Sequence, residues 1–380
     1  MKKPKVLILT TNYGNGHLQA ARALEEQFTL KKNAHVVVKD IYQETNPRLH
    51  EFTKKLYLKS FTKGGGQLYR FFYYGSQEIS KRKLPIHFPY GYTELSKIIT
   101  KERPDAIINT FPIQTVQYYL SKTNRTIPTY HVITDYCLHY SWLHPKTDKY
   151  FVATPLLESQ LVDRGIDKRK IVVSGIPVRN QFQQTYSLPY LIDKYKVNKN
   201  LKTILLIAGA HGVSKEISYI CENLERDEKV QILIVCGNNK QLYEQLQYKY
   251  QYENHIQVFG YVSHMAELLQ LATCVVTKPG GITLTEAMVK NIPIVLLKAT
   301  PGQEKENAVF FQSNGAAISF EKTEHLVKGL NRLVLNHTKL QEMKASLDNI
   351  HVPNAAETIV EHVLQTYWKQ VQTHKSLQIN

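Results

Sequence analysis

The sequence lacks the features that define several large classes of protein. No apolar run approaches the length of about eighteen residues that a membrane-spanning helix needs. The four cysteines are scattered, and no two of them form a CxxC pair. The apolar run near the N-terminus is too short for a signal peptide and leads into a glycine turn instead of a cleavage site. We therefore expect a cytoplasmic protein with free thiols.

Acidic residues are scarce, and their shortage is uneven along the chain. The formal net charge is +16, of which residues 1–150 carry +12 and residues 151–380 only +4. A strongly basic surface favours anionic partners, so the first portion should face nucleic acid, anionic lipid or a phosphorylated substrate.

Two series of short β-rich runs alternate with helix-length patterns, which is typical of parallel sheets covered on both faces. The runs lie at 5–10, 34–40, 105–111, 128–134, 149–154 and 170–175, and again at 202–209, 230–237, 256–262, 274–281 and 292–297. The predicted fold class is therefore α/β, with two Rossmann-like domains at 1–185 and 195–355. The polar stretch 180–200 is interpreted as a linker. Residues 356–380 are predicted to form a C-terminal helix that packs back on the N-terminal domain.

The first predicted strand ends in a glycine turn, with Gly14 and Gly16 directly before His17. Such a turn brings backbone N–H groups and a helix N-terminus close to an anion. A dinucleotide site is one alternative, since Asp40 could bind a ribose, but Gln19 stands where the third glycine of that fingerprint belongs. We favour the interpretation that His17 accepts a proton near pH 7.

A second chemical cluster lies in residues 277–311. Gly280 and Gly281 form a tight turn into a helix whose Thr283 and Thr285 can offer hydroxyls to phosphate. Glu286 would repel a phosphate, so it is better placed to accept hydrogen bonds from the paired hydroxyls of a ribose. After the next predicted strand, amide and acid side chains suit a polyhydroxylated ligand; they are Gln303, Glu304 and Asn307.

These residues belong to a pattern that resembles one glycosyltransferase family. Eight blocks match in order: "NYGNGH" (12–17), "INTFP" (108–112), "VITDYCLHYSWLHP" (132–145), "SGIPVR" (174–179), "AGAHGVSK" (208–215), "VFGYV" (258–262), "TKPGGITLTEA" (277–287) and "PGQEKENA" (301–308). The chain is similar to the GT-B enzymes of glycosyltransferase family 28, which include the peptidoglycan N-acetylglucosaminyltransferase and monogalactosyldiacylglycerol synthase. It resembles most the processive diacylglycerol β-glucosyltransferases. The resemblance implies two Rossmann-like domains facing each other across a cleft.

The resemblance also implies roles for individual residues. His17 and Asp135 would act at the reacting centre, either of them as the base. Glu286 would hold the ribose, and Val262 would meet the uracil through its backbone. The other donor-binding residues it implies are Gly14, Asn15, Gly16, Arg179, Gly209, Ala210, His211, Gly212, Gly280, Gly281, Thr283, Gln303, Glu304 and Asn307. His139, Trp142 and His144 would follow on the acceptor side.

The resemblance implies an inverting enzyme that would move glucose from UDP-glucose to diacylglycerol and then to glucosyldiacylglycerol. Such products resemble the glycolipid anchors of lipoteichoic acid. Galactosyl transfer from UDP-galactose and a sensor that binds UDP-glucose are the alternatives. No DxD pair ends a predicted strand, so we expect no metal and no cofactor beyond the donor.

Residues 52–92 interleave eight Lys and Arg with eleven Phe and Tyr around a single acid, Glu78. An interfacial membrane segment is the favoured interpretation, while a packed core helix and a nucleic-acid platform are alternatives. The candidate acceptor and membrane residues here are Phe71, Phe72, Tyr73, Tyr74, Lys81, Arg82 and Lys83. We therefore expect a peripheral protein at the cytoplasmic face of an anionic membrane, without a nucleic-acid partner. The sequence indicates no particular protein partner.

Overall fold

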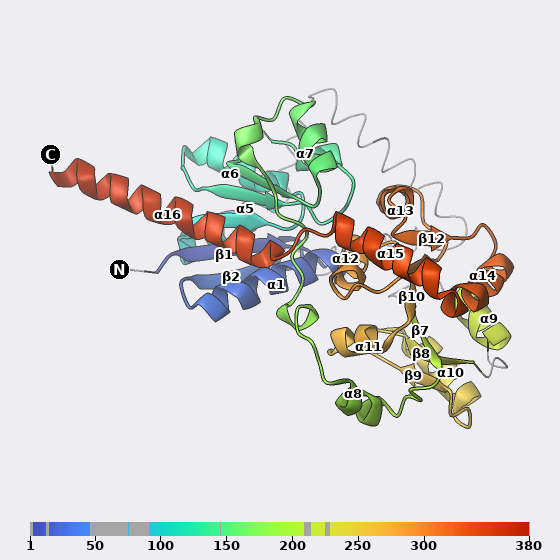
Figure 1. Cartoon of the computed structure of the whole chain (residues 1–380). Coiled ribbons are helices and arrows are strands. Elements are labelled where there is room, and N and C mark those ends of the chain that lie inside the picture. The colour runs from blue at the N-terminus through green and yellow to red at the C-terminus, as the bar shows by residue number, and fades with distance from the viewer. Residues whose placement is uncertain are drawn as a thin grey trace. The chain divides into compact units, whose positions relative to one another are not determined.

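The computed structural model describes residues 3–12, 15–45, 75, 91–144, 146–208, 214–224 and 229–379. These residues form two compact α/β units (Figure 1). The first unit holds the described residues up to Asn180 together with those from Val352 onward, and the second holds Gln181–His351. The predicted fold class, two Rossmann-like α/β domains, is confirmed.

The first unit is built on six parallel strands in the order β2-β1-β3-β4-β5-β6. The strands are β1 (Lys5–Thr10), β2 (His35–Asp40), β3 (Ala106–Asn109), β4 (Thr129–Val132), β5 (Lys149–Val152) and β6 (Ile171–Val173). The helices are α1 (Asn15–Lys31), α2 (Ile41–Thr45), α5 (Tyr92–Glu102), α6 (Gln114–Thr123), η1 (Tyr140–Trp142), α7 (Pro155–Val162), η2 (Lys168–Lys170) and α16 (Ala355–Ile379).

Helices cover both faces of this sheet because successive side chains of a strand point to opposite faces. In β1, Val6 and Ile8 pack with apolar residues of α1 and α16, whereas Leu7 and Leu9 pack with those of α5 and α6. Figure 1 shows α16 lying alongside α1, and Lys31 at the end of α1 forms ion pairs with two glutamates of α16. The last helix of the chain thus completes the core of the first unit.

The second unit has six parallel strands in the order β12-β11-β10-β7-β8-β9. The strands are β7 (Lys202–Ile207), β8 (Val230–Val235), β9 (Ile256–Phe259), β10 (Cys274–Thr277), β11 (Ile294–Leu296) and β12 (Ala317–Ser319). The helices are α8 (Leu188–Tyr195), α9 (Ser214–Leu224), α10 (Lys240–Tyr250), α11 (Met265–Leu271), α12 (Gly281–Val289), α13 (Gln303–Ser313), α14 (Thr323–Leu335) and α15 (His337–Ile350). A short η3 (Asn180–Phe182) spans the division between the units.

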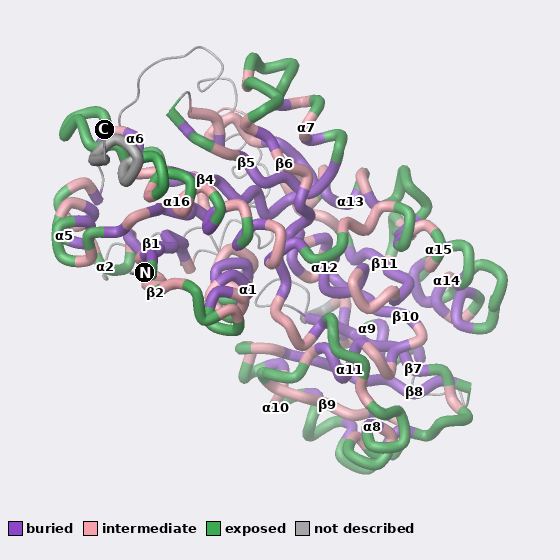
Figure 2. The backbone as a smooth tube through the Cα atoms, turned by 60° about the vertical axis from the view of Figure 1, so that its left-hand side comes forward, coloured by how far each residue is buried: buried purple, intermediate pink, exposed green. Residues whose placement is uncertain are grey.

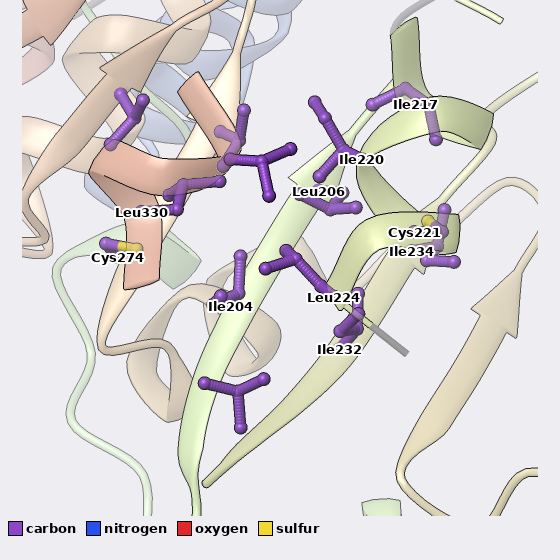
Figure 3. Close-up of a cluster of buried hydrophobic side chains, with 14 of the residues drawn as sticks. Ile204, Leu206, Ile217, Ile220, Cys221, Leu224, Ile232, Ile234, Cys274 and Leu330 are labelled. Carbon is purple, nitrogen blue, oxygen red and sulfur yellow. The ribbon is translucent and has the colours of Figure 1, made fainter. Parts of the chain in front are cut away.

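The core of the second unit is a layer of aliphatic side chains between β7, β8 and the helices that cover them. Figure 3 shows Ile204 and Leu206 of β7 beside Ile232 and Ile234 of β8, with side chains of α9 and α14 against them. In Figure 2 the strands of both units are mostly buried, and exposed positions lie on the covering helices and loops. All four cysteines are free and buried.

Each sheet reverses its strand order at one place, where ligands bind in open α/β folds. In the first unit this switch point lies between β1 and β3, and in the second between β7 and β10. The segments that follow these four strands are therefore the places to look for chemistry.

The eleven predicted strands are all present, most of them shorter at their carboxyl ends than expected. The three-residue β12 was not predicted, because it is too short to leave an apolar run. The interpretation of 180–200 as an irregular linker is wrong, since α8 forms there and packs on α11. Lys194 and Tyr195 of α8 both contact Oε2 of the buried Glu267, each at 2.6 Å. None of the described helices is both long and apolar enough to cross a membrane.

Candidate functional site

His17 lies in the first turn of α1, at the switch point of the first unit. Its Nδ1 is 2.9 Å from the backbone carbonyl oxygen of Thr110, which follows β3. The same Nδ1 is 2.8 Å from the hydroxyl oxygen of Thr134, which follows β4. The ring packs edge-on against Phe111 at a centroid distance of 5.0 Å. Residues that follow two neighbouring strands, β3 and β4, thus fix one imidazole.

The protonation state of this imidazole follows from its partners. A carbonyl oxygen can only accept, so Nδ1 of His17 carries the hydrogen and Nε2 keeps its lone pair. Burial lowers the pKa of His17 to about 4, and the hydrogen bond to the carbonyl of Thr110 opposes this shift. The ring is therefore neutral near pH 7 and can accept a proton at Nε2.

Two acidic residues named from the sequence lie at strand ends of this unit. Asp135 directly follows Thr134 and is only 9% exposed. Asp40 ends β2, and its carboxylate accepts hydrogen bonds from the backbone N–H groups of Asn12, Tyr42 and Gln43. Both oxygens of Asp40 are thus engaged by the backbone, which weakens the alternative of a dinucleotide site with Asp40 on a ribose.

The segment after Asp135 forms η1 and contains the predicted acceptor-side residues. Nδ1 of His139 accepts a hydrogen bond from the backbone N–H of Ser141 at 3.1 Å. The side chain of Trp142, which was expected on the acceptor side, is 3% exposed and packs edge-on against His131. Nδ1 of His131 in turn lies 2.9 Å from the carbonyl oxygen of Trp142. The indole is therefore buried within the first unit.

In the second unit, the glycine turn lies at the switch point and begins α12. Gly280 is the N-cap residue of this helix and has no side chain that could cap it. The backbone N–H groups of the first turn therefore receive no hydrogen bond acceptor from the side chain of the N-cap residue. Glu286 is one turn further along and only 8% exposed. The Thr285 hydroxyl donates to the carbonyl of Gly281 at 2.7 Å, so this hydroxyl supports the helix instead of being offered to a phosphate. Thr283 is half-buried.

The start of α13 lies beside this turn, because β10 and β11 are neighbours. Gly302 precedes the helix with φ +101°, a conformation that favours glycine. Glu304 accepts a hydrogen bond from the backbone N–H of Thr300 at 2.9 Å, and Gln303 is half-buried. Asn307 is fully buried and donates to the carbonyl of Pro279 at 3.1 Å. Asn307 therefore stabilises the segment directly before the glycine turn, a role that the sequence did not indicate.

One charged group at the carboxyl ends of the strands in this unit was not identified from the sequence. Glu216 lies in the first turn of α9, and its Oε2 is buried without a hydrogen-bond partner. Burial raises the pKa of Glu216, while the positive charges of Lys278 and Lys298 oppose the shift. These three residues follow β7, β10 and β11, which are adjacent in the sheet. The carboxyl ends of these strands thus carry a half-buried acid and two lysines.

The remaining predicted residues fall in separate places. Gly16 lies in the first turn of α1, which Asn15 begins. Arg179 is half-buried after β6 of the first unit, and Val262 is half-buried after β9 of the second. Several predicted residues lie outside the described ranges; they are Gly14, Phe71, Phe72, Tyr73, Tyr74, Lys81, Arg82, Lys83, Gly209, Ala210, His211 and Gly212. Within the described ranges, no group of three or more His, Cys, Asp or Glu side chains is arranged to hold a metal ion.

Comparison with known sequences supports the same division of the chain. The family model described as monogalactosyldiacylglycerol (MGDG) synthase matches residues 17–178, and the model described as glycosyl transferases group 1 matches residues 191–347. Among solved structures, the chain is similar to MurG of Acinetobacter baumannii, with a TM-score of 0.60, 16% identity and coverage of 96% of this chain and 99% of that one. It is also similar to MnaA of S. aureus in complex with UDP, with a TM-score of 0.62, 15% identity and coverage of 95% and 96%.

The two parallel sheets, their switch points and the likeness to these solved structures define the GT-B architecture, and the model that matches residues 191–347 is one of glycosyl transferases. The processive diacylglycerol β-glucosyltransferase of Bacillus subtilis (strain 168) is 44% identical over 364 residues, which cover 95% of each chain. That of Bacillus licheniformis is 41% identical over 362 residues, which cover 95% of this chain and 94% of that one. The chain belongs to the processive diacylglycerol β-glucosyltransferase family, so the resemblance seen in the sequence is confirmed.

Proposed function

We propose that this protein transfers glucose from UDP-glucose to 1,2-diacylglycerol and then to the resulting glucosyl lipid, giving mono- and β-diglucosyldiacylglycerol. Relatives that share 41–44% of its residues over nearly the whole chain are named for this activity. The donor and acceptor would each meet a switch point, the donor in the second unit and the acceptor in the first.

One observation carries the chemistry: the imidazole of His17 is held with Nδ1–H toward the carbonyl of Thr110. Nε2 of His17 would take the proton of the acceptor hydroxyl as its oxygen attacks the anomeric carbon of glucose. The bond from that carbon to the UDP oxygen breaks at the same time, and UDP leaves with the electron pair. A single displacement converts the α-linked donor into a β-glucoside. Asp135 is the rival base.

The second unit would hold UDP and stabilise its developing charge. The N-terminus of α12 presents backbone N–H groups and the positive end of the helix dipole to a diphosphate. Glu286 would accept hydrogen bonds from the ribose hydroxyls, and Gln303 and Glu304 would read the hexose. Arg179 would add a positive charge to the diphosphate. These groups supply the stabilisation for which other enzymes use a metal, so activity should survive chelation with EDTA.

We further propose that the protein acts as a peripheral enzyme on an anionic membrane, at its cytoplasmic face. The acceptor is a lipid, and residues 1–150 carry a net charge of +12. Each basic residue near an anionic surface contributes about 1 kcal/mol, and salt screens this attraction. Flotation with anionic liposomes should therefore fall as the salt concentration rises. Binding that is equal in low and high salt would contradict the electrostatic part of this proposal.

The function is tested by a transfer assay on anionic liposomes that contain diacylglycerol. UDP-glucose and UDP-galactose are supplied in parallel, and the glycolipids are resolved by mass. We expect mono- and diglucosyl lipid with UDP-glucose alone. Equal turnover of UDP-galactose would favour the galactosyl alternative. Tight UDP-glucose binding without any product would favour a sensor.

The base is tested in the same assay with His17→Gln. Loss of the general base should lower kcat roughly 10²- to 10⁴-fold without loss of UDP-glucose affinity. His325→Gln is a matched control, because His325 is exposed on α14. A His17→Gln variant with wild-type kcat would transfer the role of base to Asp135.

A further inference from the structure

The hydroxyl of Thr134 is the only side-chain partner of the His17 ring nitrogens among the hydrogen bonds of the described residues. The other partner of Nδ1 is the backbone carbonyl of Thr110, and the hydroxyl of Thr110 donates to the backbone carbonyl of His17 at 3.1 Å. Within the described part of the chain, no carboxylate hydrogen-bonds to this ring. The charge that forms on the imidazole is therefore met by neutral oxygens.

Thr134 is suited to this contact by its position and its side chain. It is 3% exposed and follows β4, whose neighbour in the sheet is β3. A β-branched side chain has few accessible χ1 rotamers, so its hydroxyl is held in place before the reaction begins. Since Nδ1–H is directed at Thr110, the oxygen of Thr134 acts as a second acceptor for the same hydrogen.

We propose that Thr134 is a positioning residue for the base. The carbonyl of Thr110 fixes the tautomer, whereas the hydroxyl of Thr134 orients the His17 ring and stabilises the imidazolium when a proton arrives at Nε2. Hydrogen bonds to a charged group are worth more than those to a neutral one, so this contact strengthens as the reaction proceeds. The catalytic part of this role rests on the proposed function of His17, whereas its stabilisation of the charged ring does not.

The test compares Thr134→Val, which removes the hydroxyl at nearly constant volume, with Thr134→Ser, which keeps it. We expect Thr134→Val to lower kcat about tenfold, equivalent to about 1.4 kcal/mol, with the KM for UDP-glucose within about twofold. Thr134→Ser should recover most of the loss. The matched control is Thr129→Val, because Thr129 is buried at the other end of β4 and its hydroxyl donates to the carbonyl of Ile127.

Two further readouts separate a positioning role from a structural one. In a His17→Gln background, Thr134→Val should produce no additional loss, because the residue acts through the ring. In protein labelled with ¹⁵N-histidine, the signals missing from His17→Gln identify this ring, and the ring should protonate at a lower pH in Thr134→Val than in the wild type, because its imidazolium loses an acceptor. Unchanged kcat and unchanged titration of the ring in Thr134→Val, or an equal loss in the His17→Gln background, would overturn the proposal. If His17→Gln alone kept full activity, the base assignment would fall, and the titration would still decide whether Thr134 stabilises the charged ring.

Discussion

Mild acid should destabilise the first unit, and most sharply through His131. This histidine is 3% exposed in β4, and burial lowers its pKa to about 4 from the ordinary value of 6.5. The unfolded chain therefore binds a proton as the pH falls below about 6.5, while the folded chain binds none until about pH 4. The neutral, buried His131 therefore costs no stability above pH 6.5. As the pH falls from 6.5 to 4, the free energy of unfolding decreases progressively.

The two pKa values give the magnitude. Between pH 7.5 and pH 5, linkage predicts that His131 lowers the free energy of unfolding by about 2 kcal/mol. His17, whose pKa burial also lowers to about 4, titrates in the same window in the wild type and in the variant, so its effect cancels in their comparison. Replacing His131 with Phe keeps an aromatic ring between Trp142 and Tyr150 and removes the titration. The variant should therefore lose about 2 kcal/mol less than the wild type over this pH range.

The assay is urea unfolding at both pH values, followed by tryptophan fluorescence. Both tryptophans, Trp142 and Trp368, lie in the first unit, so the signal reports this unit alone. His325→Gln should show the wild-type pH dependence, because His325 is exposed in the second unit. The reasoning would be refuted if the wild type and His131→Phe lost the same free energy of unfolding between pH 7.5 and pH 5.

Three other predictions concern the second unit. Glu286→Gln should weaken UDP binding roughly 10- to 100-fold by calorimetry, because a charged acceptor facing hydroxyls is lost; unchanged affinity would remove Glu286 from the ribose site. Glu216→Gln should raise the thermal stability of the second unit at pH 7, because burial raises the pKa of Glu216 and its contribution is lost as the pH rises above about 4.5; a lower transition temperature would contradict this. Gly329→Ala should destabilise this unit by about 1–3 kcal/mol despite the better helix propensity of alanine, because a Cβ there would collide with the ring of Phe320; a stabilised variant in urea unfolding would show that the ring moves aside.

The strands were predictable because both faces of a parallel sheet are buried, which leaves continuous apolar runs in the sequence. The predicted carboxyl ends lie beyond the observed ones where the apolar run of the sequence continues into residues of the candidate site. The run at 128–134, for example, passes Val132 into Thr134. Helix α8 was missed because its eight residues leave one buried position, Leu191, and so no periodicity to detect. Short elements that depend on tertiary contacts give little local signal.

The site was predictable only in part. His17 and Asp135 stand out as reactive residues at strand ends, and the glycine turn before Glu286 is visible as a motif. The contact between His17 and Thr134 joins residues 117 positions apart, and no spacing rule predicts it. Trp142 was expected on the acceptor side, and nothing in the sequence indicated that the fold buries its side chain against His131. What a side chain touches across a sheet depends on register, which the sequence does not show directly.

The return of the chain to the first unit has a consequence for synthesis on the ribosome. The sheet face formed by residues such as Val6 and Ile8 is closed partly by Ile359 and Val363, which are translated after the whole second unit. At roughly 5–20 residues per second, that interval lasts on the order of ten to thirty seconds. During it, the nascent chain holds an unfinished apolar surface in the first unit while the second unit is being translated. Chaperones that bind exposed hydrophobic surfaces of nascent chains would therefore matter most for the first unit. It is the first unit to be translated and the last to be completed.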